Sequence, residues 1–309
     1  MFKFQKDVCS ALGICLALIL GTSFLLPAGV AVGQETDKPM VLCSTTHVAD
    51  FARNVVGDRW VVNCVLAPGE DPHTYKPTSD DVAIVKQATL CLENGWHLEG
   101  NEWMRTLATN AGKPLVSCVD GVEPLMAEEE DKEVNDPHAW FDIDNAMIYV
   151  ANIRNAVRKL DPEHAAEYNA RAKLYLLQLR VLKQWVAQEV NAIPKSQRLL
   201  VTHHDAFGYF ARAYGFKAVS PVGWSTGEIT GVTIEDRQAT VNQIKQLGVK
   251  SIFVETSVNQ ELVDGIARET GVTIGGTLYS DAMGPPGSAG ESFIGMYREN
   301  VLTIVKSLK

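Results

Sequence analysis

The strongest constraint on the fold is an alternation of short apolar runs with helical segments, which occurs twice along the chain. The first alternation covers residues 40–120 and the second covers residues 198–309. Strands that alternate with helices indicate parallel sheets built from βα units. The sequence therefore predicts an α/β protein with two lobes, each a parallel sheet flanked by helices.

A long helical segment separates the two alternating regions. Asp161 is a good N-cap, Pro162 is a good first helical residue, and the next proline is Pro194. A helix between these prolines would have about 32 residues and extend about 48 Å at 1.5 Å per residue. The segment lacks a sustained heptad with charged flanks, so it favours a rigid helix joining the lobes over a coiled coil. Such a helix would permit small lobe tilts and loop motion but not large hinge closure.

The N-terminal segment is typical of a secretory signal peptide. Lys3 and Lys6 form a short basic region, residues 11–32 carry no charge, and small residues precede a cleavage position near Gly33. A membrane anchor is the alternative, but Pro27 and the polar sequence that follows end the apolar run early. Export through a cleaved signal peptide is the prediction.

The sequence shows no lipoprotein cleavage site, because neither Cys9 nor Cys15 follows a small residue at the end of the apolar run. We therefore expect a soluble periplasmic protein if the cell has two membranes. The predicted organisation has four parts: a signal peptide at 1–33, an N-terminal α/β lobe at 34–160, a linking helix at 161–194 and a C-terminal α/β lobe at 195–309.

The charge of the chain argues against nucleic acid and anionic lipid as partners. The formal net charge is −9, and residues 1–33 hold two lysines and one aspartate, so the remainder carries −10. A net acidic, mixed surface repels polyanions and is compatible with binding cations. It does not locate a cation site.

Four cysteines follow the signal segment, and each lies in a short apolar run without a C-x-x-C pattern: Cys43, Cys64, Cys91 and Cys118. Buried free thiols are the favoured interpretation. A disulfide is the alternative, since export permits one, but neighbouring parallel strands rarely present the required geometry. A cysteine metal site is not expected.

Metal-ligating residue types occur in four loops, each of which follows a strand or lies at a lobe edge. The tripeptide Asp-Pro-His occurs twice and supplies His73 and His138, while "VTHHDAF" offers His203, His204 and Asp205, and "LYSDAMG" offers Asp281. Ligands of open α/β sheets collect at such edges. Three imidazoles and one carboxylate suit a tetrahedral or five-coordinate divalent cation. The sequence therefore predicts one metal site formed by residues of these four loops.

The residues around these loops have simpler interpretations as well. Asp71 and Asp136 could accept from an imidazole N–H, as partners of metal-bound histidines do, or cap a loop. Asp205 and Asp281 could cap helices. Residues 126–136 are acidic and aperiodic and predict an exposed loop. The remaining histidines are expected to be structural, and three aromatics near the loops to pack: His47, His97 and His164, with Trp140, Phe207 and Tyr209.

Seven segments resemble a known family: "STTHVADFARNVVGD", "APGEDPHTYKPTSDDV", "LENGWHLEG", "NDPHAWFD", "VTHHDAFGYFARAYGF", "IFVETSV" and "IGGTLYSDAMG". Over essentially all of the exported chain they look like the TroA/ZnuA-like zinc/manganese solute-binding proteins of ABC transporters, and most like the TroA branch. The resemblance implies one metal ion between two lobes joined by a rigid helix. It implies the ligands His73, His138, His204 and Asp281, no ligand role for His203, and at most a supporting role for Glu255.

Two departures leave the metal open. The zinc-dedicated branch often carries a long His-rich acidic loop, but residues 126–136 lack histidine. The manganese-dedicated branch usually has Glu where His204 stands. The resemblance thus implies a non-enzymatic monomer that captures one Zn²⁺ or Mn²⁺ and delivers it to an ABC membrane permease. The alternatives are a zinc-dependent hydrolase, against which the lack of an H-E-x-x-H motif argues, and a metal-dependent adhesin.

Overall fold

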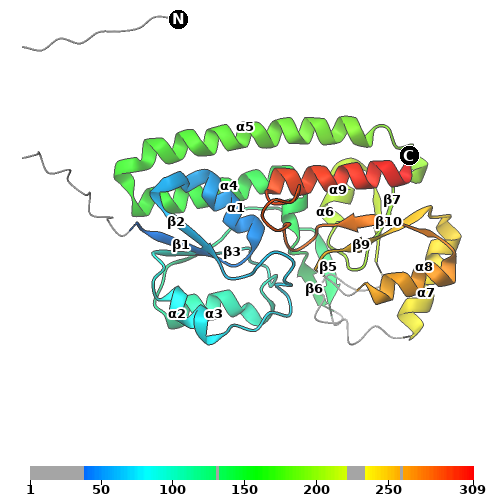
Figure 1. Ribbon diagram of the computed structural model, residues 1–309, viewed down its shortest axis with the longest axis horizontal. Coiled ribbons are helices and arrows are strands. Elements are labelled where there is room, and N and C mark those ends of the chain that lie inside the picture. The colour runs from blue at the N-terminus through cyan, green and yellow to red at the C-terminus, as the bar shows by residue number, and fades with distance from the viewer. Residues whose placement is uncertain (1–37, 130–131, 221–233, 258–259) are drawn as a thin grey trace, which may run out of the picture. The chain divides into compact units, whose positions relative to one another are not determined.

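The structure is a computed structural model that describes residues 38–129, 132–220, 234–257 and 260–309. Residues Lys38–Lys309 form one compact unit (Figure 1). The predicted signal peptide at residues 1–33 lies outside the described residues. The predicted division of the chain into an N-terminal lobe, a linking segment and a C-terminal lobe stays a prediction. Among the helices described, none is both long enough and apolar enough to cross a membrane.

The first half of the unit is a four-stranded parallel sheet in the order β2-β1-β3-β4. Its strands are β1 (Met40–Cys43), β2 (Val61–Cys64), β3 (Leu90–Glu93) and β4 (Leu115–Ser117). Its helices are α1 (Thr46–Val56), α2 (Ser79–Val85) and α3 (Trp103–Asn110). Along β1, Val41 and Cys43 join the core around α1, whereas Met40 and Leu42 join the core around α2 and α3. Both faces of the sheet are therefore buried, as the continuous apolar run of β1 requires.

The four cysteines that follow the signal segment are free thiols, as favoured, and three of them are buried, whereas Cys64 is only half-buried. Cys43 and Cys64 are register partners on β1 and β2, yet they are not bonded to each other. Burial raises the pKa of the Cys43 thiol well above its usual range. The protonated thiol is thus favoured, which makes it a poor nucleophile and a poor metal ligand.

Helices α4 (Ile143–Leu160), α5 (Ala165–Val190) and α9 (Phe293–Leu308) pack with α1 into one large core. Figure 1 shows α5 running alongside α4 and α9 past both sets of strands. The linking helix begins later than predicted, at Ala165. Asp161 does not cap it, because its carboxylate accepts from the His164 ring and the Tyr168 hydroxyl, and Pro162–His164 form a 3-10 turn. The helix proper has 26 residues.

In the second half, the described residues form two separate parallel strand pairs. β7 (Leu199–Val201) pairs with β8 (Lys217–Val219), and β9 (Ser251–Glu255) pairs with β10 (Thr273–Leu278). The helices of this half are α6 (Gly208–Tyr214), α7 (Ile234–Leu247) and α8 (Glu261–Thr270). The predicted α/β class is confirmed: parallel strands flanked by helices occur both before and after the long helix α5 in the sequence.

The prediction of an exposed loop at residues 126–136 was wrong. β5 (Met126–Glu129) and β6 (Lys132–Asn135) pair as an antiparallel hairpin, with Met126 opposite Asn135. Ladder hydrogen bonds satisfy the backbone there whatever the side-chain charge, and an acidic composition does not reveal such pairing. The hairpin leads directly into the second Asp-Pro-His.

Candidate metal centre

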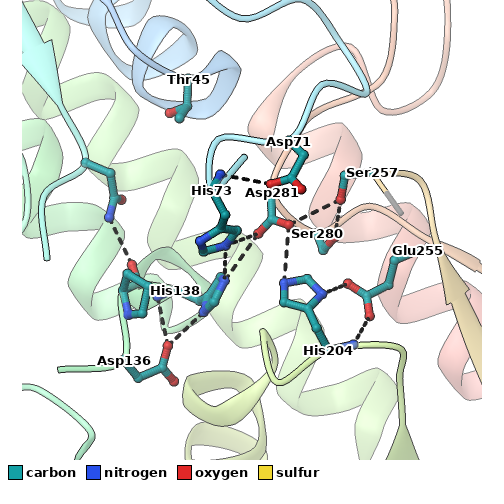
Figure 2. Close-up of polar contacts among 12 residues, drawn as sticks. Thr45, Asp71, His73, Asp136, His138, His204, Glu255, Ser257, Ser280 and Asp281 are labelled. Carbon is teal, nitrogen blue, oxygen red and sulfur yellow. Dashed lines mark hydrogen bonds and ion pairs between the residues drawn. The ribbon is translucent and has the colours of Figure 1, made fainter. Parts of the chain in front are cut away.

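The four predicted ligands meet at one point, although they come from four different connections. His73 lies between β2 and α2, His138 follows β6, His204 follows β7 and Asp281 follows β10. One ligand atom from each lies within 4.8 Å of those of the other three, and all four residues are buried. Figure 2 shows the three imidazoles turned toward the Asp281 carboxylate. We call these residues the four-residue cluster.

Three spacings within the cluster match a coordination shell, while a fourth, from His73 Nε2 to Asp281 Oδ1, is longer at 3.9 Å. The Nε2 atoms of His73 and His138 are 3.3 Å apart. His138 Nε2 lies 3.3 Å from Asp281 Oδ1, and His204 Nε2 lies 3.2 Å from Asp281 Oδ2. A tetrahedral ion about 2.0–2.1 Å from each ligand atom would set neighbouring ligand atoms about 3.3–3.4 Å apart. The side chains could therefore hold a divalent cation with little movement.

Both Asp-Pro-His tripeptides use their aspartate in the same way. Asp71 Oδ1 accepts from the His73 backbone N–H at 2.9 Å, and Asp136 Oδ1 accepts from the His138 backbone N–H at 2.9 Å. Asp136 Oδ1 also lies 2.8 Å from His138 Nδ1, which leaves Nε2 facing the cluster. The aspartate thus shapes each loop, and at His138 it orients the ring as well.

Replacing Asp136 with alanine is expected to lower metal affinity about 10- to 100-fold, the usual effect of removing the partner of a metal-bound histidine. The His138 ring would lose the acceptor that fixes its orientation. Competition against a chelating dye measures the change. Asp142→Ala is the matched control, because its carboxylate caps α4 just beyond the same loop. Equal affinities for both variants would show that Asp136 does not orient the ring.

The carboxylates around the cluster favour protonation of two of its three histidines. Burial opposes charge on His138, but Asp136 and Asp281 together raise its pKa to about 9. Burial also opposes charge on His204, yet Glu255 and Asp281 raise its pKa well above the usual value. For His73 burial dominates and lowers the pKa to about 3. Without a cation, the neighbouring carboxylates therefore favour the protonated forms of His138 and His204.

Asp281 is the common partner of the cluster. Burial would raise its pKa, but His204 and His138 hold that pKa well below its usual range. The Ser257 hydroxyl donates to its Oδ2 at 3.2 Å. Because both of its oxygens face imidazoles, Asp281 could bind an ion through one oxygen or two. The cluster thus offers four or five donors.

His204 is held from its other edge by Glu255. Glu255 Oε2 lies 2.7 Å from His204 Nδ1, and Oε1 accepts from the backbone N–H groups of His203 and His204. Burial would raise the pKa of Glu255, but His204 lowers it. The predicted role of Glu255 as a support for a ligand therefore fits its position. His203 is fully buried beside it.

Two residues that hold the second Asp-Pro-His loop escaped the sequence analysis. Asn94, just after β3, donates from Nδ2 to the Pro137 carbonyl at 3.0 Å, and the Tyr149 hydroxyl donates to Asn94 Oδ1 at 2.7 Å. Tyr209 on α6, expected to pack only, donates its hydroxyl to the Asp136 carbonyl at 2.9 Å. Nothing local in the sequence signals these contacts, because each joins residues from distant segments.

The first Asp-Pro-His loop is packed against Gly100. A β-carbon at Gly100 would lie 1.9 Å from the His73 carbonyl oxygen. We expect Gly100→Ala to push the loop away, lowering metal affinity about 10-fold and stability by about 1–3 kcal/mol, as overpacking does. Gly275→Ala is the control, because its β-carbon would overlap Ser307 and Phe253 on other elements. It should lose stability but keep affinity, measured by thermal unfolding and chelator competition.

Two aspartates do not have the capping role that was considered for them, whereas several other residues lie as expected. Asp205 does not cap α6, because that helix begins after Phe207 without a side-chain cap. Asp281 caps no helix; it lies in the cluster. His47 stays structural, with its ring stacked on Trp140 at 4.1 Å between centroids. Trp140 and Phe207 are buried core residues as expected, and the other two histidines predicted to be structural contact acidic neighbours outside the cluster: His97 with Glu102, and His164 with Asp161.

Comparison with known proteins places these features in a family. Residues 41–307 match the model of the family described as zinc-uptake complex component A, periplasmic. The chain is 35% identical over 306 residues to the manganese-binding lipoprotein MntA of Bacillus subtilis, covering 96% of this chain and 99% of that protein. It is 34% identical over 310 residues to the zinc-binding protein TroA of Treponema pallidum, covering 98% and 99%.

The fold has a solved counterpart. The structure of the periplasmic zinc-binding protein TroA from Treponema pallidum superposes with a TM-score of 0.82 and 33% sequence identity. The match covers 88% of this chain and 99% of that chain. These relatives are named for two different metals.

Proposed function

The chain belongs to the family of the periplasmic zinc-uptake component A, and from that premise we propose that it captures Zn²⁺ or Mn²⁺ outside the cytoplasm and delivers the ion to the membrane permease of an ABC importer. The ion is cargo, held at one site per chain. His73, His138, His204 and Asp281 are its ligands. The protein acts as a monomer.

One observation carries the assignment of ligands. Three imidazole Nε2 atoms and a carboxylate converge from four separate connections, fully or almost fully buried. Buried polar groups are normally satisfied, and buried charges are paired or coordinate metals. A divalent cation would replace the two stored protons and satisfy every ligand atom at once.

The donor set favours transport over catalysis. Catalytic zinc keeps an open position and needs a base beside it. Four protein ligands, one of which could bind through both oxygens, fill the shell. A carrier of this kind should therefore not hydrolyse esters or phosphate esters when loaded with zinc. The names of the relatives reported above refer to metal binding and give no support to the adhesin alternative.

The donors also bear on the choice of metal. Imidazole suits Zn²⁺, and at equal geometry Zn²⁺ binds more tightly than Mn²⁺. A two-oxygen contact from Asp281 would give a fifth donor and lessen that difference. We propose a site that accepts both metals, with the cargo set by supply.

Competition binding on the metal-stripped mature protein tests the proposal. Zn²⁺ and Mn²⁺ are titrated against a chelating dye, and elemental analysis gives the stoichiometry. We expect one ion per chain, with Zn²⁺ tighter. A lack of stoichiometric binding by either ion would overturn the proposed function, and turnover of ester or phosphate substrates by the zinc-loaded protein would favour the hydrolase.

A further inference from the structure

His203 is the most anomalous residue beside the cluster. Its side chain is fully buried, and neither Nδ1 nor Nε2 of its ring has a hydrogen-bond partner among the described residues. Buried polar atoms without partners are destabilising and rare in native structures. The four-residue cluster makes no use of this ring. A bound group that contacts the His203 ring would supply the missing partner for its nitrogen atoms.

A second set of metal donors contains this residue. One donor atom each from His203, His204 and Glu255 lies within 4.8 Å of the others, and all three residues are buried. Two imidazoles and one glutamate form a donor set that proteins use for zinc, with the fourth position left open. We call these three residues the His203 site.

The two sets share His204 but use opposite edges of its ring. His204 Nε2 lies 3.2 Å from Asp281 Oδ2, whereas Nδ1 lies 2.7 Å from Glu255 Oε2. Figure 2 shows the His204 ring between these two carboxylates. We propose that the His203 site is a second binding station for the divalent cargo, on the Glu255 side of His204. This inference rests on the proposed function, because it concerns the same cargo.

The shared ring makes the two stations mutually exclusive. A neutral imidazole has one lone pair for a metal and one N–H. With the ion in the four-residue cluster, Nε2 binds it and Nδ1–H faces Glu255. With the ion at the His203 site, Nδ1 binds it and Nε2–H faces Asp281. One proton leaves Nδ1 and one is taken up at Nε2, so the total stays constant and the chain holds one ion at a time.

The test removes two ligands of the four-residue cluster and measures whether the His203 site still binds a metal ion. His73→Ala/His138→Ala leaves only His204 and Asp281 of the cluster. Co²⁺ is the probe, since its visible absorption reports coordination by protein ligands. We expect this double variant to bind one Co²⁺ per chain more weakly than the wild-type protein, and added His203→Phe to abolish saturable binding. Added His97→Phe is the matched control, because that side chain is exposed.

Circular dichroism establishes that each variant is folded, and added Glu255→Gln replaces His203→Phe if the latter unfolds the chain. The inference is overturned if the double variant binds no Co²⁺ while the wild-type protein binds one. It is also overturned if added His203→Phe, or Glu255→Gln in its place, leaves binding unchanged. Absence of binding by the wild-type protein would instead overturn the proposed function and this inference with it.

Discussion

Replacing His138 with alanine will lower the affinity for Zn²⁺ by more than about 100-fold, because removing even the partner of a metal-bound histidine costs 10- to 100-fold. The variant loses one of four converging donors. In the wild-type protein, His138 Nε2 lies 3.3 Å from both His73 Nε2 and Asp281 Oδ1. Chelator competition at fixed pH measures the loss. An unchanged affinity would refute the ligand assignment.

The same variant should remain folded, since His138 lies in a connection and the large apolar core is built from helices α1, α4, α5 and α9. Circular dichroism of the metal-free protein checks this. His97→Ala is the matched control, because its side chain is 66% exposed and its Nδ1 lies 3.9 Å from Glu102 Oε1, outside the cluster. It should bind Zn²⁺ as tightly as the wild-type protein does.

Elements whose residue types alone determine their structure were predicted well, and elements that depend on particular side-chain contacts were not. Strands β1 and β3 are short apolar runs buried on both faces, so their composition alone indicated them. The start of α5 was misplaced because Asp161 turns its carboxylate to Tyr168 and His164 instead of capping. Propensity describes what Asp prefers at a helix start, and side-chain contacts with residues three and seven positions later overrode it.

The candidate site was predictable where the chain repeats itself. The two Asp-Pro-His tripeptides make the same backbone turn, in which the aspartate accepts from the histidine N–H two residues later. Residue type and spacing sufficed to single them out. Asn94 and Tyr209 could not be found in this way. Each reaches the second loop across a gap of many residues, and only the folded chain brings them there.

The unused donors beside the cluster illustrate a different limit. The resemblance to the family implies a ligand role for His204 and none for its neighbour His203. Backbone N–H groups of both histidines converge on Glu255, which places both rings near one carboxylate. Only the burial of the His203 ring without a partner distinguishes it from an ordinary core histidine.

Zinc affinity will rise steeply with pH, by about 10-fold per unit for each proton that the ion displaces. Burial opposes protonation of His138, but Asp136 and Asp281 raise its pKa to about 9, and Glu255 and Asp281 raise that of His204 well above its usual value. Both rings must lose the Nε2 proton to bind the ion. Between pH 6 and 8 the affinity should therefore rise by about 100-fold per unit. His73, with a pKa of about 3, contributes nothing to this slope.

The stability of the metal-free protein should change in the opposite direction. The folded pKa of His138 lies above the ordinary value of 6.5, so its contacts with Asp136 and Asp281 stabilise fully below about pH 6.5 and lose that effect as the pH rises through about 9. Thermal unfolding from pH 6 to 9 should show the metal-free protein weakening while the zinc-loaded protein does not.

Titration calorimetry in two buffers of different ionisation enthalpy counts the protons directly. About two should be released per Zn²⁺ at neutral pH, by the same linkage. Asp136→Ala removes one of the carboxylates that raise the pKa of His138, so in this variant the count should fall toward one and the pH profile should flatten. A wild-type affinity independent of pH, with no proton release, would show that the metal-free cluster does not store protons on His138 and His204. The ligands would then be assembled already neutral, and the carboxylates around them would need another source of compensating charge.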